Sequence, residues 1–153
     1  MVSIGPNCAE VGIVMHELGH ALGFYHEQSR PDRDKYVEII EENIIPFKRD
    51  QFEMKDVAQV DSLGEPYDFN SVMHYTADAF VMPNKTEVMR RKPCCPGSTM
   101  GWQGKLSPSD IRQTNLLYKC HCKLHFFLKV KIGIYIIKVS FQLLDSLSLK
   151  NVN

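Results

Sequence analysis

At 153 residues the chain is long enough for one domain with a buried core, and its apolar fraction of 44% is ordinary for a globular domain. The 18 basic and 18 acidic residues balance, so charge gives no reason to expect nucleic acid or an anionic membrane as a partner. The most apolar run, Leu124 to Phe141, is interrupted by lysines. Because each lysine at mid-bilayer costs roughly 2.5–3.5 kcal/mol, we expect no membrane span.

The segment from Ala9 to Leu22 has the spacing of an amphipathic helix. Its apolar side chains cluster on one side of such a helix, at Val11, Val14, Leu18 and Leu22. His16 and His20 fall on the opposite side. Gly23 follows directly, and glycine ends helices readily because it adopts the left-handed conformation without a Cβ penalty.

The middle of the chain predicts little regular structure. RPDRDKYVEII indicates a tight turn over Pro31–Asp34 and a short strand over Tyr36–Ile40. One or two helical turns are expected after Pro46, and the stretch Ser62–Tyr75 is typical of a loop. The segment Met82–Gly104 is rich in proline and glycine, which predicts an irregular surface loop.

A second helix is predicted to begin beside Ser107. This serine is a favourable capping residue, Pro108 suits the first helical position, and Asp110 places a negative charge in the first turn.

The composition changes after Cys120, and two interpretations of residues 123–153 stay open. The segment forms a strand pair if the alternation of apolar residues with lysines at its centre reflects a β pattern. Alternatively, it is non-coding sequence translated beyond the end of the domain, because it holds few acidic residues and no clear turn chemistry. We favour the second interpretation.

The stretch HELGHALGFYH has the spacing of a catalytic zinc site. His16 and His20 are four residues apart, so on a helix both imidazoles project from one face and reach one ion at zinc–nitrogen distances of about 2.0–2.1 Å. Glu17 is rotated about a quarter-turn around the axis. There its carboxylate lies beside the ion and can act as a general base toward water that the metal activates. Chain reversal at Gly23 brings His26 to a third position.

Three protein nitrogens that leave one position open are typical of catalytic rather than structural zinc. The pattern HExxH alone arises by chance on amphipathic helices, whereas the extended spacing with Gly23 and His26 in register is far more specific. A second metal site in CHCKLH, residues 120–125, would need a further ligand from the loop that holds Cys94 and Cys95, and we do not favour it.

The sequence HELGHALGFYHEQSRPDRD resembles the zinc signature of the astacin metallopeptidases, which belong to the metzincin clan. The resemblance implies that His16, His20 and His26 bind one zinc ion (Zn2+) per chain. It also implies that Glu17 is the general base.

A second motif, SVMHY, supports the same resemblance. Metzincins have a tight turn with a methionine beneath the zinc, which implies that Met73 forms an apolar floor under the histidines. Tyr75 would be an additional, displaceable zinc ligand that donates a hydrogen bond to the substrate oxyanion. Taken alone, Met73 and Tyr75 would be interpreted as core residues. His74 has no role that the resemblance requires, and we expect it beside the ligands or at the surface.

The fold implied by the resemblance is α+β. Residues 1–122 would form part of a metzincin-type catalytic domain, with an active-site helix, a mostly irregular C-terminal subdomain and a C-terminal helix. The family's N-terminal sheet, propeptide and signal peptide are not expected in this chain. Glu27 would therefore lack the chain terminus that it binds in the family, and Cys8 and Cys120 would lack their upstream partners.

Two functions from different classes follow from these motifs. The first is a secreted zinc endopeptidase that hydrolyses protein or peptide substrates. The second is a truncated fragment that binds zinc but is inactive, because it lacks the edge strand that holds extended substrate. A structural zinc module fits poorly, because no fourth protein ligand closes the site.

Overall fold

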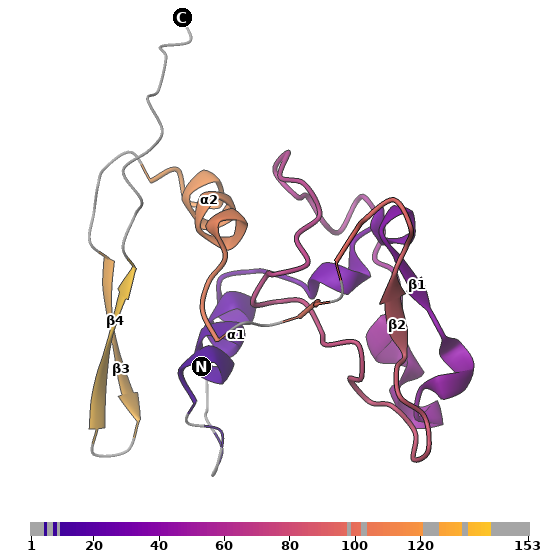
Figure 1. Ribbon diagram of the computed structural model, residues 1–153. Coiled ribbons are helices and arrows are strands. Elements are labelled where there is room, and N and C mark those ends of the chain that lie inside the picture. Colours follow the sequence, from indigo (N-terminus) through magenta and orange to yellow (C-terminus); the bar gives the residue numbers. More distant parts are fainter. Residues whose placement is uncertain are drawn as a thin grey trace, which may run out of the picture. The chain divides into compact units, whose positions relative to one another are not determined.

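The computed structural model describes residues 5, 8, 10–97, 99–101 and 104–120, and the backbone of 126–132 and 135–141. The chain divides into two units, Met1–Leu117 and Tyr118–Asn153. The first unit holds helices α1 (Val11–Ala21) and α2 (Pro108–Leu117) and strands β1 (Val37–Ile39) and β2 (Met89–Arg91) (Figure 1). It also holds short 3₁₀ helices at Glu27–Ser29, Arg33–Lys35, Glu41–Asn43 and Pro46–Phe52.

Both predicted α-helices are confirmed. Helix α1 begins two residues later than predicted because Glu10 has an extended backbone, and it ends at Ala21 with Leu22 as its cap. Gly23 has a φ of 97°, the left-handed conformation expected for the residue after a helix. The helical turns expected after Pro46 are confirmed as 3₁₀ structure.

The strand predicted over Tyr36–Ile40 is confirmed as β1, but the prediction of an irregular loop from Met82 to Gly104 is wrong at one place. Strand β2 lies inside that segment and pairs antiparallel with β1, with Ile39 opposite Met89. The cause is long-range: Val88 and Met89 are fully buried by residues from other parts of the chain. A three-residue strand carries too little local pattern to be recognised from the sequence.

The larger hydrophobic core lies around the two strands. Its fully or nearly fully buried members are Val37, Ile44, Phe52, Tyr67, Val88, Met89 and Met100. Tyr75 is half-buried and packs against this core, where its ring meets that of Phe52 and the Tyr67 ring meets that of Phe69. The core therefore supports the loop that carries SVMHY rather than helix α1.

A smaller core attaches α1 to that loop. Met15 packs with Val72 and Met73, which are each 1% exposed. A Cβ added at Gly19 would lie 2.5 Å from the Met73 sulfur, so the missing side chain lets the methionine lie directly against the helix. The apolar side predicted for α1 is covered unevenly by the described residues, since Val14 is buried and Val11 is 55% exposed.

The N-terminus of α2 holds the same loop through one carboxylate. Ser107 and Asp110 form a reciprocal capping pair, each accepting the backbone N–H of the other through its side chain. Asp110 also accepts the Ser71 hydroxyl at 2.6 Å and the Val72 N–H at 3.0 Å. Burial raises the pKa of Asp110, while these hydrogen bonds oppose the rise. Asp110, a capping residue of α2, thus also holds the turn at Ser71, which lies 39 residues away in sequence.

The second unit contains an antiparallel strand pair, β3 (Phe126–Ile132) and β4 (Tyr135–Phe141). A strand pair is one of the two interpretations of residues 123–153 that the sequence leaves open, and the backbone of β3 and β4 has this form. Translation beyond the domain end, the interpretation that we favour, stays a prediction. Cys122 and His125 of the disfavoured second metal site lie outside the described residues. None of the described helices combines the length and apolarity needed to cross a bilayer.

We predict that Asp110→Asn destabilises the first unit by about 3 kcal/mol. The Asn carbonyl oxygen can replace Oδ2 as acceptor for the Val72 and Ser107 N–H groups, but the Asn NH₂ then replaces Oδ1 opposite the Ser71 hydroxyl. The three hydrogen bonds also lose their charged acceptor, and such bonds are worth about 1 kcal/mol more each than neutral ones. Urea unfolding of the chain measures the loss. Asp56→Asn is the matched control, because this exposed carboxylate accepts the N–H of nearby Ala58, and its cost should stay within about 0.5 kcal/mol. Equal costs at both positions would contradict the role given to Asp110.

We also predict that Gly19→Ala destabilises the chain by about 1–3 kcal/mol, because the new methyl group meets the buried Met73 sulfur. Gly5→Ala is the control, since a Cβ there meets nothing within 4 Å. In a Met73→Ala background the cost of Gly19→Ala should disappear, and a double-mutant cycle by urea unfolding measures this. An unchanged cost in that background would show that the contact is not the cause.

Candidate functional site

Helix α1 places His16 and His20 one turn apart, and a backbone carbonyl orients each ring. His16 Nδ1 lies 2.8 Å from the Val72 carbonyl oxygen, and His20 Nδ1 lies 2.9 Å from that of Phe24. A carbonyl oxygen only accepts, so each Nδ1 carries the hydrogen. In the neutral form of both rings Nε2 therefore keeps its lone pair free, as a metal ligand requires.

The turn after α1 brings His26 toward the other two rings. Gly23 N–H donates to the His20 carbonyl and Phe24 N–H donates to the Gly19 carbonyl, both at 3.0 Å. These two bonds form a Schellman motif, in which the residue after the helix is left-handed. The turn also orients His20, because it positions the Phe24 carbonyl that accepts a hydrogen bond from His20 Nδ1.

The three imidazoles converge on one point through their Nε2 atoms. His26 Nε2 lies 3.2 Å from that of His16 and 3.1 Å from that of His20. Two nitrogens bound to one tetrahedral zinc ion at about 2.0–2.1 Å lie about 3.3–3.4 Å apart. Within the described part of the chain, these three residues are the one group with the spacing of a metal site.

The protonation of the cluster fits a cation. Burial, and then the charges of His20, His16 and Lys55, lower the pKa of His26 to about 3. The Nε2 of a neutral His26 carries at most one hydrogen, but it faces the Nε2 atoms of both His16 and His20. At least one of these two contacts would therefore bring two nitrogen lone pairs together with no proton between them. A shared divalent ion removes that repulsion and satisfies all three nitrogens. The residues present therefore fit zinc.

Glu17 and Tyr75 lie next to the cluster. Glu17 is exposed on α1 and follows His16 directly. The Tyr75 ring packs against the His26 ring, with 4.4 Å between centroids. Burial raises the pKa of Tyr75, and the charges of Asp50 and Glu17 raise it further. The structure thus packs the Tyr75 ring on His26, and the Glu17 charge acts on the same tyrosine. The catalytic roles given to both residues stay proposals.

Met73 lies against the helix that carries two of the histidines. Its sulfur contacts α1 at Gly19, between the turns that carry His16 and His20. Its carbonyl accepts the Glu27 N–H at 3.0 Å. Met73 therefore connects the helix with the segment that follows the third histidine.

Glu27 is buried, and the structure gives it partners that the sequence did not predict. One carboxylate oxygen accepts Arg30 Nη1 at 3.0 Å and the Asp68 N–H at 2.8 Å. Burial raises the pKa of Glu27 to about 7, although Arg30 acts in the opposite direction. Arg30 also binds both oxygens of Asp32. This charged turn is therefore a buried ion-pair network that supports the loop before SVMHY.

Two polar residues support the Tyr75 backbone, and the sequence motifs assign a role to neither. Gln28 is fully buried and accepts the Tyr75 N–H through Oε1. His74 is 1% exposed, so of the two positions expected for it, beside the ligands or at the surface, the structure excludes the surface. Its Nδ1 donates to the Tyr75 carbonyl and its Nε2 accepts the Tyr67 hydroxyl. Gln28 and Tyr75 are 47 residues apart, and no local pattern signals such a pair.

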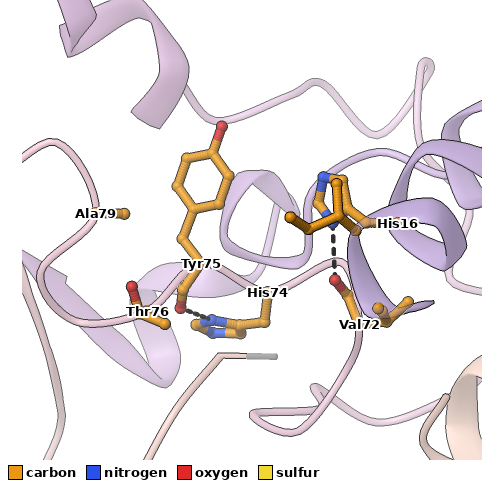
Figure 2. Close-up of a pocket in the computed structure, with 8 residues that line it drawn as sticks. His16, Val72, His74, Tyr75, Thr76 and Ala79 are labelled. Carbon is orange, nitrogen blue, oxygen red and sulfur yellow. Dashed lines mark hydrogen bonds between the residues drawn. The ribbon is translucent and has the colours of Figure 1, made fainter. Parts of the chain in front are cut away.

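A cavity of about 210 Å³ opens beside His16. It is lined by Gly12, Ile13, His16, Val72, His74, Tyr75, Thr76 and Ala79. Figure 2 shows His16 and the Tyr75 ring standing on different sides of this space, with the bond between His16 and the Val72 carbonyl at one edge. The cavity therefore borders both the metal-ligand cluster and the tyrosine.

Comparisons with known proteins agree with this geometry. The model of the astacin peptidase family matches residues 1–119. The chain is 45% identical over 127 residues to "Bone morphogenetic protein 1 homolog" of Strongylocentrotus purpuratus, covering 78% of this chain and 19% of that protein. It is 48% identical over 120 residues to "Zinc metalloproteinase nas-39" of Caenorhabditis elegans, covering 78% of this chain and 13% of that protein.

A solved structure is similar as well. High choriolytic enzyme 1, a hatching enzyme zinc-protease from Oryzias latipes, matches with a TM-score of 0.72 and 42% identity, over 78% of this chain and 58% of that one. The chain thus spans less than two thirds of each of these relatives. The α+β fold expected from the sequence is confirmed, and the chain belongs to the astacin family of zinc metallopeptidases.

Proposed function

We propose that the chain is a zinc-dependent endopeptidase that acts on protein or peptide substrates outside the cell. His16, His20 and His26 hold one zinc ion per chain, Glu17 is the general base, and Tyr75 assists as a further ligand and hydrogen-bond donor. The observation that carries the proposal is the convergence of three Nε2 atoms, with His26 Nε2 at 3.2 and 3.1 Å from those of His16 and His20, beside the Tyr75 ring. Bound there, zinc supplies Lewis acidity, which lowers the pKa of water toward about 7 and polarises a carbonyl.

Glu17 is the residue proposed to move the proton. It follows His16 on α1, about a quarter-turn further around the axis, which supports a position beside the ligands rather than among them. A carboxylate at this place can accept a proton from the attacking water. The same group can then pass that proton to the leaving amine.

Tyr75 is suited to donate a hydrogen bond to the oxyanion. Burial and two neighbouring carboxylates raise its pKa, so the free phenol stays protonated at neutral pH. A phenol held by a packed ring costs little reorganisation when charge develops on the substrate oxygen. Met73 and Glu27 support the site as structural residues, through the backbone bond that joins them and the bond from Glu27 to Asp68.

The alternative is a zinc-binding fragment without activity, and one observation favours it. In the described part of the first unit, no strand is longer than three residues. An extended peptide is commonly held by pairing with an exposed sheet edge. If this chain offers no such edge, it binds zinc and does not position a peptide for attack.

We predict that the purified chain binds one zinc and cleaves a denatured protein, and that Glu17→Gln keeps the zinc but slows cleavage by at least about 100-fold. A general base typically contributes about 10²–10⁴ in rate. Metal content by elemental analysis and cleavage rates measured together check this. Glu41→Gln, an exposed carboxylate outside the site, is the matched control and should keep full activity.

The other outcomes separate the two functions. Stoichiometric zinc that is lost on replacing the three histidines, without cleavage by the unchanged chain, would establish the inactive fragment. Cleavage that survives complete chelation, or that Glu17→Gln leaves intact, would overturn the proposed chemistry.

A further inference from the structure

The backbone of Tyr75 is held from three sides, and the first holder is Gln28. The Tyr75 N–H donates to Gln28 Oε1 at 3.1 Å, and this amide side chain is fully buried. The segment that holds Gln28 and the SVMHY loop share a second hydrogen bond beside this one, in which the Glu27 N–H donates to the Met73 carbonyl. The residue that follows the third histidine by two positions thus fixes the N–H of the tyrosine.

The second holder is His74. Its Nδ1 lies 2.7 Å from the Tyr75 carbonyl oxygen (Figure 2). Since that oxygen only accepts, Nδ1 carries the hydrogen, and the Tyr67 hydroxyl, at 2.8 Å, donates to Nε2. Tyr67 belongs to the larger core, where its ring stacks on Tyr36 with 4.6 Å between centroids. The carbonyl of Tyr75 is therefore tied to the core through one buried imidazole.

The third holder is Gly101. Its φ is 89°, and its N–H donates to the Phe69 carbonyl at 2.9 Å. A Cβ on this residue would lie 2.8 Å from the Tyr75 carbonyl carbon and 2.7 Å from the Thr76 nitrogen. The close approach that glycine permits places one chain segment directly against the peptide bond that follows the tyrosine.

The ring of Tyr75, in contrast, packs among other rings. Its centroid lies 4.4 Å from that of His26, 5.7 Å from that of Phe52 and 5.6 Å from that of Phe80. Ring pairs pack in several arrangements, offset or edge-to-face, whereas a hydrogen bond weakens steeply as its angle changes. The two hydrogen bonds and the close approach of Gly101 therefore constrain the backbone of Tyr75 more closely than the ring contacts constrain its side chain.

We propose that Gln28, His74 and Gly101 are positioning residues, here called the Tyr75 clamp, which fix the backbone of the tyrosine beside the histidine cluster. The inference rests on the proposed function for the metal-ligand role of Tyr75. It adds that these three residues, through two hydrogen bonds and one close backbone approach, set the place at which the phenol would meet a bound ion.

The test compares Gln28→Met, which keeps the volume but removes the acceptor, with Gln28→Glu, which keeps an acceptor oxygen. Residue-resolved amide hydrogen exchange of the zinc-loaded chain follows the Tyr75 N–H. We expect Gln28→Met to speed its exchange by about fivefold or more, the equivalent of one lost hydrogen bond, and Gln28→Glu to restore much of the protection. Asn43→Leu, which removes a side-chain bond to the Glu87 carbonyl elsewhere, is the control and should leave Tyr75 exchange unchanged relative to its neighbours.

A spectroscopic measurement on the same variants distinguishes positioning from general support. In the copper(II)-loaded chain, a coordinated phenolate gives a ligand-to-metal absorption band in the visible range. We expect Gln28→Met to weaken or shift this band and Gln28→Glu to restore it. Unchanged exchange and an unchanged band in Gln28→Met would overturn the clamp. A wild-type chain that binds copper without the band would overturn Tyr75 as a ligand, and exchange alone would then decide whether the backbone is clamped.

A second inference comes from an independent feature, the turn over residues 82–86. The Met82 N–H donates to the Asn43 carbonyl and a bridge joins Ile44 to Val81, so the base of the turn is anchored. Its tip, residues 83–86, is exposed, and Asn84 has a φ of 66°. The tip carries the sequence Asn-Lys-Thr, an acceptor pattern for N-linked glycans.

We infer that Asn84 is an N-glycosylation site, provided that the chain is secreted as proposed. The Asn84 side-chain nitrogen would form a bond to the first sugar of a lipid-linked oligosaccharide, with loss of an amide proton and departure of the lipid diphosphate. An anchored turn with an exposed tip accommodates a glycan without displacing either core. The Thr86 hydroxyl is the part of the pattern that the transfer requires.

Translation of the full chain behind a cleavable signal sequence, in the presence of microsomes, tests this inference. The imported, protease-protected chain should gain mass that an N-glycosidase removes. Thr86→Val, which is isosteric but lacks the hydroxyl, should abolish the gain, whereas Thr86→Ser should keep it. An imported wild-type chain without a glycan would overturn the inference. Because this readout needs no activity, it is independent of whether the proposed peptidase function holds.

Discussion

The arrangement of this molecule depends on three imidazole nitrogens meeting at one point. Each pair that includes His26 is separated by little more than 3 Å, a distance at which the lone pairs of neutral rings repel unless a proton or an ion lies between them. In both His16 and His20, the other ring nitrogen, Nδ1, donates a hydrogen bond to a backbone carbonyl. The cluster therefore has the form of a ligand set rather than of a hydrogen-bonded group.

The peptide of Val72 connects this ligand set with the rest of the unit. The Val72 carbonyl accepts a hydrogen bond from His16 Nδ1, and the Val72 N–H donates one to the Asp110 carboxylate. Asp110 is the capping carboxylate of α2 and also binds Ser71. One buried acidic group thus supports His16, a proposed metal ligand, through a single residue of the loop. Burial raises the pKa of this group, and the donors around it reduce the rise. The proposed clamp on Tyr75 uses Gln28, His74 and Gly101 in place of Asp110, but it acts on the same SVMHY loop.

The sequence revealed those parts of the site that local geometry determines, and long-range contacts determine the rest. The three histidines depend on one helix and one glycine turn, and the structure places them together. Asp110 was recognisable as part of a helix start, but nothing in a cap signals a second partner such as Ser71, 39 residues away. Gln28 and His74 stand inside the two motifs without a role that the motifs assign, yet both are buried with hydrogen bonds to the backbone of Tyr75. Strand β2 likewise exists because β1 and the larger core lie beside it.

Because the hydrophobic side chains form two separate cores, the proposed metal would contribute to the stability of the fold as well as to the chemistry. The larger core joins residues 36–100 and does not include α1. Helix α1 is attached through the small cluster of Met15, Val72 and Met73 and through the bond of His16 to Val72. Burying three such side chains contributes about 1.5–3 kcal/mol each, a modest total against the entropy of ordering eleven helical residues. An ion held, as proposed, by two residues of α1 and by His26, which lies beyond the glycine turn, would add a direct link between the helix and the segment that follows it. Binding of such an ion and the docking of α1 would then be thermodynamically coupled, each favouring the other.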